Sequence, residues 1–442
     1  MKVSEKVIKS YKKNSVKKTL VVSFPDLGHV VEYNKIYQES MGLKESLMED
    51  ENNFKIQGCV SSEFKVKIRD FGQDVAGSRI EASIFTEETE DEPVKLFTGY
   101  VKSVKMQANK QLKEIVAYDM LHGFGNEDVT EWWNSIEEGW YTIGNIRKQF
   151  LEAYSIQYIE DTLPNDNVSF YKKVKATELS KLDMLKNICQ VNAVFGIVNR
   201  EGQMEFRKIR GESTGGAYPG LTLWPPFYPG VEGKTPLEYN PVATYRNLSF
   251  EEFTVHPADL VVVRDSENAK QYTYGSGKNK YIVQGNIFLL SNPDEVYNNV
   301  ASNIYEQIKD FFYVPYQASN NGFPFIECGV DSVAYETYDF NASQRARSGD
   351  VYEERSFQVL SRNLKGIQVL KDEYSAKGDE YQTEFLTDTN SKIENLRKES
   401  QNAQLEIEEI KEEQEKPLVI WVPNRESIGT ESGVFYAIEK KG

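Results

Sequence analysis

Cysteine is scarce in this chain. Its three cysteines, Cys59, Cys189 and Cys328, are far apart, odd in number and outside any C-x-x-C spacing. Neither a disulfide framework nor a structural zinc site is therefore indicated. The pattern is typical of a protein that is made in a reducing compartment.

Histidine is equally scarce, and the motifs of common catalytic centres are missing. The three histidines, His29, His122 and His256, have no H-x-x-x-H or H-E-x-x-H spacing, so the ligand set of a metallopeptidase is not visible. The sequence has no G-x-S-x-G elbow and no cysteine with a histidine nearby. We predict that the protein is not an enzyme and holds no metal and no cofactor.

A positive net charge and long apolar runs are also absent. Lys and Arg number 52 against 68 Asp and Glu, a net charge of −16, which argues against sequence-specific nucleic-acid binding through a basic surface. No stretch approaches the roughly 20 apolar residues of a membrane-spanning helix, so no stable membrane insertion is expected. Seven lysines lie within residues 1–19, but only the short apolar run Leu20–Val22 follows, too little for a signal peptide.

Alternating hydrophobicity predicts sheet in the first quarter of the chain. Period-two spacing is clearest from Val60 to Ile68, with lysines and an arginine on the other face. The acidic stretch Glu87–Glu92, closed by Pro93, is typical of a solvated hairpin loop. Strands are expected around it at 80–84, 94–97, 100–107 and 113–118. These elements predict a small antiparallel β-barrel or sandwich over residues 20–120.

The spacing becomes helical after residue 121. Apolar residues from Ile143 to Tyr154 fall on one helix face. A second helix is expected to begin either at Ser180, with Asp183 at capping-box distance, or one turn earlier at Thr177. These helices and a following β-hairpin predict an α+β domain over residues 121–210.

A second β-rich region follows a stretch rich in glycine and proline, residues 211–241, which is predicted to be a linker. Asn292 followed by a proline and two acids predicts a helix over 293–312, capped by Asn292. Strands are expected on both sides of this helix, including Phe325–Val330. The second β-rich domain is predicted to span residues 242–375.

The segment 380–416 has the spacing of a coiled coil. Apolar or small residues follow one another at intervals of 3, 4, 3, 4, 3, 4 and 3, with Glu and Lys dominating between them, and Pro417 ends the pattern. We expect self-association into a parallel bundle; a solvated helix and a helix folded back on the body are the alternatives. The seam residues are Leu386, Thr389, Ile393, Leu396, Ser400, Ala403, Ile407 and Ile410.

One stretch has the composition of an enzyme or sugar-binding cleft. Carboxylates beside aromatic platforms are what a glycosidase uses, one as acid and one as its ionised partner. A domain-junction core with acids facing water is the alternative, because no second distant carboxylate signal accompanies it. The residues concerned are Glu127, Asp128, Glu131, Trp132, Trp133, Glu137, Glu138 and Trp140.

Two further stretches carry a family resemblance. The clearer one runs from Gly349–Asp350 through Phe357–Arg362 and on to Tyr374, and a looser one runs from Glu39–Leu47 into residues 58–70. In these stretches and in the order of elements over residues 20–375, the chain resembles the tail hub proteins of phages and related contractile injection particles, particularly those of Firmicutes-type tails.

The resemblance implies a homotrimer that forms a ring under the tail tube. Two β-barrel domains per chain would match a sixfold tube to a threefold spike or fibre and form part of the conduit. The implied partners are the tail tube or distal tail protein, the spike or tail fibre, and a tape-measure protein. The implied place is the virion tail tip or baseplate, assembled in the bacterial host cytoplasm. A tail-associated cell-wall hydrolase and a tip protein that binds host-surface carbohydrate are the alternatives.

The predicted fold class is α+β, mainly β. Two small antiparallel β-barrel-like domains flank an α+β insert, and a C-terminal coiled-coil stalk follows. The predicted parts are a basic N-terminal arm at 1–19, the first β domain at 20–120, the α+β domain at 121–210, the linker at 211–241, the second β domain at 242–375, the coiled coil at 380–416 and a docking segment at 417–442.

Overall fold

The structure is a computed structural model. It describes residues 3–13, 15–49, 56, 58–107, 111–208, 221–222, 245–266, 269–338, 352–378, 418–423 and 433–438. The chain divides into two compact units, Met1–Phe385 and Leu386–Gly442. In the described part of the chain, no helix is both long and apolar enough to cross a membrane.

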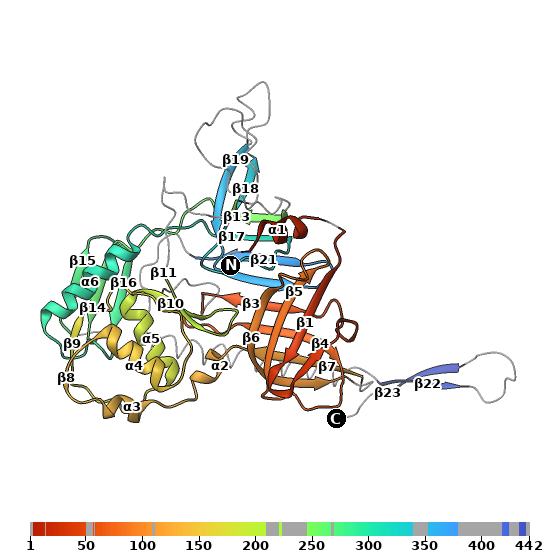
Figure 1. Cartoon of the computed structure of the whole chain (residues 1–442). Helices are drawn as coiled ribbons and strands as arrows, with labels where there is room; N and C mark the ends of the chain where they lie inside the picture. Colours follow the sequence, from red (N-terminus) through yellow and green to blue (C-terminus); the bar gives the residue numbers. More distant parts are fainter. Residues whose placement is uncertain are drawn as a thin grey trace, which may run out of the picture. The chain divides into compact units, whose positions relative to one another are not determined.

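A large antiparallel sheet dominates the first unit (Figure 1). Over the described residues it has 11 strands in the order β13-β17-β21-β20-β3-β4-β7-β6-β5-β1-β2. The strands are β1 (Lys18–Phe24), β2 (His29–Val31), β3 (Gly42–Ser46), β4 (Glu63–Arg69), β5 (Arg79–Thr86), β6 (Val94–Met106), β7 (Leu112–Tyr118), β13 (Tyr245–Phe250), β17 (Tyr316–Asn321), β20 (Ser361–Lys365) and β21 (Lys371–Ala376). Two 3₁₀ turns, η1 (Pro25–Leu27) and η2 (Tyr33–Lys35), flank β2.

Alternating burial confirms the strand predicted from period-two spacing. In β4, the side chains of Phe64, Val66 and Ile68 are fully buried, and the residues between them are partly covered. Burial alternates in the same way along β5. A strand of this kind places its apolar side chains in the core and leaves its other face to water.

Strand β6 is one continuous strand, where the sequence pattern predicts two strands at 94–97 and 100–107. The backbone continues through Gly99. A side chain would not fit at this position, because a Cβ there would lie 2.3 Å from the Tyr118 carbonyl oxygen and 2.5 Å from the Phe97 ring. A register shift between Val101 and Ser103 marks a β-bulge just beyond it. Glycine in a strand thus marks close approach at a bulge here, not an end of the strand.

Strand β3 connects the two predicted β regions. It pairs with β4 on one side and with β20 on the other, so Leu43 lies opposite both Phe64 and Leu364. Strands from residues 20–120 and from 242–375 therefore share one sheet. The closure of either region into a barrel stays a prediction.

The predicted basic arm carries an amphipathic helix, α1 (Glu5–Tyr11). Its Val7 and Ile8 are buried in the core. On its polar side, Lys6 pairs with Asp91 at 2.6 Å and Lys13 pairs with Glu88 at 2.5 Å. Two lysines of the arm are therefore partners of the acidic hairpin loop, and the apolar face of the helix holds the segment against the body.

The predicted α+β insert contains two amphipathic helices and a hairpin. The capping box decides where the second helix begins: the Asp183 backbone N–H donates to Ser180 Oγ at 3.1 Å, and the Ser180 N–H donates to the Asp183 carboxylate at 3.3 Å. The elements are α2 (Leu121–Phe124), α3 (Thr130–Ser135), β8 (Gly139–Thr142), α4 (Ile143–Ala153), β9 (Ser169–Lys172), α5 (Lys181–Asn192), β10 (Val194–Val198) and β11 (Met204–Lys208).

Part of the second predicted β domain packs against this insert. Figure 1 shows α6 and its small sheet beside α4 and α5. Asn286 Nδ2 donates to the Asn187 carbonyl at 2.9 Å, and Tyr281 Oη donates to the Gln190 carbonyl at 2.9 Å. These bonds reach across about 100 residues of sequence, which no local pattern indicates. The elements are β14 (Leu260–Arg264), β15 (Tyr272–Gly275), β16 (Lys280–Gln284) and α6 (Asp294–Ile308).

The start of α6 differs from the prediction. The N-cap is Pro293 and makes no side-chain cap bond, and the helix begins at Asp294, not at 293. Asn292 is engaged elsewhere, since its Oδ1 accepts from the Tyr171 N–H at 2.7 Å and its Nδ2 donates to the Tyr171 carbonyl at 3.3 Å. A long-range contact has replaced the local cap.

The remaining described strands form small sheets. Residues 325–330, predicted to be a strand, run as turns instead. Strands β12 (Leu221–Thr222), β18 (Ser332–Tyr338) and β19 (Tyr352–Gln358) pair with one another. In the second unit, the two apolar stretches of the predicted docking segment form a hairpin, β22 (Leu418–Pro423) with β23 (Gly433–Ile438). The eight seam residues of the predicted coiled coil lie outside the described residues.

Candidate functional site

The tryptophan-rich segment does not form an aromatic platform. Trp133, on α3, is fully buried, and its Nε1–H donates to the Val174 carbonyl at 3.0 Å. Trp132 packs against Phe150, with ring centroids 5.4 Å apart. Trp140, on β8, is 60% exposed. The three indoles therefore belong to core, core edge and surface.

Two carboxylates of the same segment, those of Asp128 and Glu127, have structural partners nearby. Asp128 Oδ1 accepts from the Thr130 N–H at 3.1 Å and from its hydroxyl at 2.5 Å, and these bonds lower the pKa of Asp128. They fix the first turn of α3. Glu127 forms an ion pair with Lys181 at the start of α5. Both acids therefore organise helix starts.

A cavity of about 430 Å³ lies beside Glu127, between the middle of β6, the end of β7, α2, the residues that follow α4 and the start of α5. The His122 ring stacks on Tyr118 at 4.2 Å on its wall. Asp119, a second acid among its lining residues, is 3% exposed. Burial raises the pKa of Asp119 to about 6 against the effect of its hydrogen bonds.

Asp119 does not complete a catalytic pair with Glu127. Its Oδ2 accepts from the Ser62 N–H at 2.6 Å, and its Oδ1 accepts from the Ser61 hydroxyl at 2.8 Å and the Leu121 N–H at 3.0 Å. A retaining or inverting glycosidase needs two carboxyl groups aimed at one bond. Here the Asp119 carboxylate joins the residues just before β4 to the start of α2. The cavity therefore does not present two carboxyl groups aimed at one bond.

Three buried arginines form a second, far stronger candidate site, which we call the arginine junction (Arg200, Arg207 and Arg362 with their acidic partners). Arg362, on β20, is 1% exposed and holds Asp372 of β21 through bonds of 2.8 to 3.1 Å. Its Nη1 also donates to Glu45 of β3 at 3.1 Å. One guanidinium thus ties together three neighbouring strands of the sheet.

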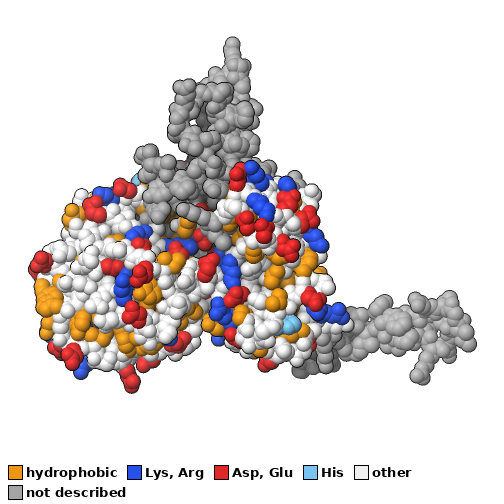
Figure 2. Space-filling view, viewed as in Figure 1, with side chains coloured by type: hydrophobic (Ala, Val, Ile, Leu, Met, Phe, Trp, Pro, Cys, Tyr) orange, Lys and Arg blue, Asp and Glu red, His pale blue; other side chains and the backbone are white. Residues whose placement is uncertain are grey.

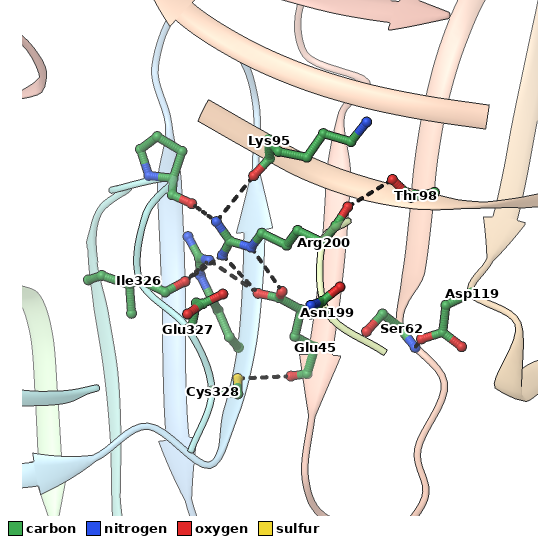
Figure 3. Close-up of polar contacts among 12 residues, drawn as sticks. Glu45, Ser62, Lys95, Thr98, Asp119, Asn199, Arg200, Ile326, Glu327 and Cys328 are labelled. Carbon is green, nitrogen blue, oxygen red and sulfur yellow. Dashed lines mark hydrogen bonds and ion pairs between the residues drawn. The ribbon is translucent and has the colours of Figure 1, made fainter. Parts of the chain in front are cut away.

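Arg200 approaches the same centre from the turn between β10 and β11 (Figure 3). Its guanidinium donates to the carbonyls of Pro324 and Ile326 and lies 3.5 Å from a carboxylate oxygen of Glu45. Arg362 also donates to the Ile326 carbonyl and, at 2.7 Å, to that of Phe323. These arginines use the carbonyls of the 323–326 segment, which explains why it runs as turns and not as a strand.

Arg207, on β11, completes the junction. It pairs with Glu205 at 2.8 Å, lies 3.8 Å from Glu327 and donates to the Cys328 carbonyl. Burial raises the pKa of Glu327, but nearby positive charges, among them those of Arg200 and Arg207, lower it more, and the result is a pKa of about 2. Glu327 is therefore ionised at any physiological pH.

The arginine junction joins three parts of the first unit: the sheet, the β10–β11 hairpin and the 323–331 segment. Buried charges are tolerated only where they are paired and fully hydrogen-bonded. No local sequence pattern indicates this site, because its members lie far apart in the chain. The one local signal that could have indicated the junction is an arginine within a strand of otherwise alternating pattern, as at Arg362.

No metal-binding geometry is found in the described parts of the chain. There, no three His, Cys, Asp or Glu side chains are placed to hold an ion. On the face drawn in Figure 2, acidic and basic side chains of the described residues are interspersed. The predicted seam from Leu386 to Ile410, which lies outside those residues, stays a prediction.

The chain is similar to solved structures of phage tail proteins. The tail protein from Neisseria meningitidis MC58 is 10% identical, with a TM-score of 0.46, over 81% of this chain and 97% of that one. The 43 kDa tail protein of prophage MuSo2 from Shewanella oneidensis is 9% identical, with a TM-score of 0.44, over 81% and 98%. The prophage tail protein gp18 from Listeria monocytogenes EGD-e is 10% identical, with a TM-score of 0.43, over 81% and 94%. No family model and no curated protein sequence matches the chain.

Proposed function

We propose that this chain is a structural hub of a phage tail tip or baseplate, or of a related injection particle. Three copies form a ring that adapts a sixfold tail tube to a threefold spike or fibre, and the ring is part of the conduit. The chain performs no chemistry itself. Its partners are a second and third copy, the tail tube or distal tail protein, the spike or fibre, and the tape-measure protein.

The arginine junction is the observation that carries this proposal. It fastens the α+β part to the shared sheet through Arg200 and fastens neighbouring strands to one another through Arg362. Because removal of either partner leaves a charge buried without compensation, the parts resist separation. A ring that holds its shape while a tube and a spike pull on it requires this kind of rigid body.

The heptad pattern at 380–416 supports the threefold assembly. Its polar and small seam positions, Thr389, Ser400 and Ala403, weaken the stalk on its own. The stalk is therefore stabilised by the folded domains that it joins. The resemblance of residues 20–375 to tail hubs points to the same number of copies.

Light scattering coupled to size exclusion tests the stoichiometry. The full chain, of 50.7 kDa, is expected to elute as a species of three times that mass. Ile393→Asp places a charge in the seam and should shift the mass towards the monomer, because a buried aspartate in a coiled-coil core is costly. Asn395→Asp adds the same charge outside the seam and should leave the trimer intact. A monomeric full chain, or equal behaviour of the two variants, would contradict the proposal.

A tip protein that binds host-surface carbohydrate is a second candidate, favoured by one observation. Trp140 is 60% exposed, and its ring meets the Tyr171 ring edge-on at 5.5 Å. An exposed indole is a common stacking surface for a sugar ring. Binding of the isolated chain to host cells, lost in Trp140→Ala, would support this function, and absence of binding in both would exclude it.

A further inference from the structure

Two of the three cysteines are in contact. Cys59 precedes β4, and Cys189 lies on α5, 130 residues later in the chain, yet their Sγ atoms are 3.6 Å apart. Both are free thiols, with 7% and 0% of the residue exposed. The hub function does not use this pair, and nothing in the sequence pattern indicates it.

Strand β10 holds the two sulfurs together. Cys59 bridges Gly196 in parallel, and the Gly196 N–H donates to the Gly58 carbonyl at 3.0 Å. A Cβ at position 196 would lie 2.7 Å from Cys59 Sγ and 3.1 Å from Cys189 Sγ. The absence of a side chain at Gly196 therefore makes the space in which the sulfurs meet.

Burial and charged neighbours favour the protonated form of the Cys189 thiol. Glu49 accepts from the Cys59 N–H at 3.4 Å and pairs with Lys186, on the helix of Cys189, at 3.0 Å. Burial, the bond to Cys59 and the charge of Glu49 raise the pKa of the Cys189 thiol, while Lys186 lowers it. The thiolate is the reactive form of a cysteine, so the raised pKa slows the oxidation of Cys189.

We propose that Cys59 and Cys189 form an intramolecular disulfide once the chain meets a disulfide oxidant outside a reducing compartment. With oxidised glutathione, two S–H bonds break and one S–S bond forms. Two electrons and two protons pass to the oxidant, which is released as two molecules of reduced glutathione. The sulfurs, 3.6 Å apart, need to approach to about 2.05 Å. The bond ties the segment before β4 to α5 and closes a long loop, which disfavours the unfolded state. This inference does not depend on the hub function.

The test uses the full chain, purified under reducing conditions and then incubated with oxidised glutathione. Thiols are counted in denaturant, and the unreduced digest is mapped by mass spectrometry. We expect the count to fall from three to one, with one new linked species that joins the peptides of Cys59 and Cys189. Three remaining thiols, glutathione adducts without the link, or a link to Cys328 would overturn the proposal.

Two matched variants sharpen the test. Cys328 is also buried, and its Sγ donates to the Glu45 carbonyl at 3.5 Å in the arginine junction. Cys328→Ser should form the same link and finish with no thiol. Gly196→Ala should lose the link, because the added methyl occupies the space between the sulfurs. The wild-type mass map needs no variant, so a variant that fails to fold does not decide the outcome. Equal cross-linking in Gly196→Ala, with its fold confirmed by circular dichroism, would contradict the geometry proposed.

Discussion

The arginine junction and the segment 126–140 both gather charged groups, but they differ in what surrounds the charges. In the junction, Arg362 and Asp372 are 1% and 0% exposed, and three hydrogen bonds join them. In the segment, Glu127 pairs with Lys181 while its side chain is 47% exposed. The density of charge along the sequence favours the segment as a functional site. In the structure, however, the charges that contribute most to stability are the buried ones of the junction. The burial of charged groups, and not their clustering along the sequence, decides how much they contribute to stability.

Truncation of Arg362 is the largest effect expected from this difference. Arg362→Ala leaves Asp372 and Glu45 without their shared cation, and a buried pair broken in this way costs about 3–5 kcal/mol of unfolding free energy. Lys365→Ala, on the same strand, removes an exposed pair with Glu373 at 2.9 Å and should cost less than about 1 kcal/mol. Urea unfolding of both variants measures the contrast. Equal costs would show that the junction is not held by its buried charges.

The tryptophans of the segment provide a test of burial within one stretch of sequence. Trp133→Ala removes a fully buried indole and its bond to Val174, with an expected loss of about 3–5 kcal/mol. Trp140→Ala removes an exposed one and should stay within about 0.5 kcal/mol. Thermal unfolding of the two variants separates them. If Trp140→Ala destabilised the chain as much as Trp133→Ala does, the burial of the indole would not determine its contribution to stability.

Acid should weaken the junction through Glu327. Its folded pKa of about 2 lies below the ordinary 4.5, so its ionised form stabilises the fold above pH 4.5. This contribution is lost as the pH falls from 4.5 through 2. Glu327→Gln should therefore be less stable than the parent chain at pH 7, by on the order of 3 kcal/mol, with a difference that narrows below pH 4.5. Unfolding midpoints measured from pH 7 to pH 3 test this. A difference that did not change with pH would mean that the charge of Glu327 is not involved.

The smallest effect is expected at Glu127. Because its ion pair with Lys181 is half exposed, Glu127→Gln should change stability by less than about 1 kcal/mol. Neither the parent chain nor the variant should clear peptidoglycan in a zymogram. Clearing by the parent that Glu127→Gln abolishes would restore the hydrolase alternative.

Sequence patterns predicted local structure well. Alternation indicated β4, and the pair Ser180 and Asp183 was one of the two starts that the local pattern allowed for α5, because both signals are contained in a few neighbouring residues. The prediction failed where a distant partner took over. The Asn292 side chain bonds to the Tyr171 backbone and does not cap the helix. The carbonyls of residues 323–326 accept hydrogen bonds from Arg200 and Arg362 and not from a neighbouring strand.

The candidate site was harder to predict for the same reason. Directly bonded members of the arginine junction are separated by up to 317 residues, as between Glu45 and Arg362. Nothing within a short window distinguishes a buried arginine from one that faces water. The acidic, tryptophan-rich segment attracted attention because its residues are adjacent, yet adjacency along a chain does not aim side chains at a common point.

The symmetry of the assembled chain tests the central claim most directly. Negative-stain electron microscopy of the full-length protein, with class averages viewed down the particle axis, reports symmetry without reference to any partner. The hub account predicts closed rings with threefold symmetry. Single asymmetric particles or twofold dimers at the same protein concentration would contradict it.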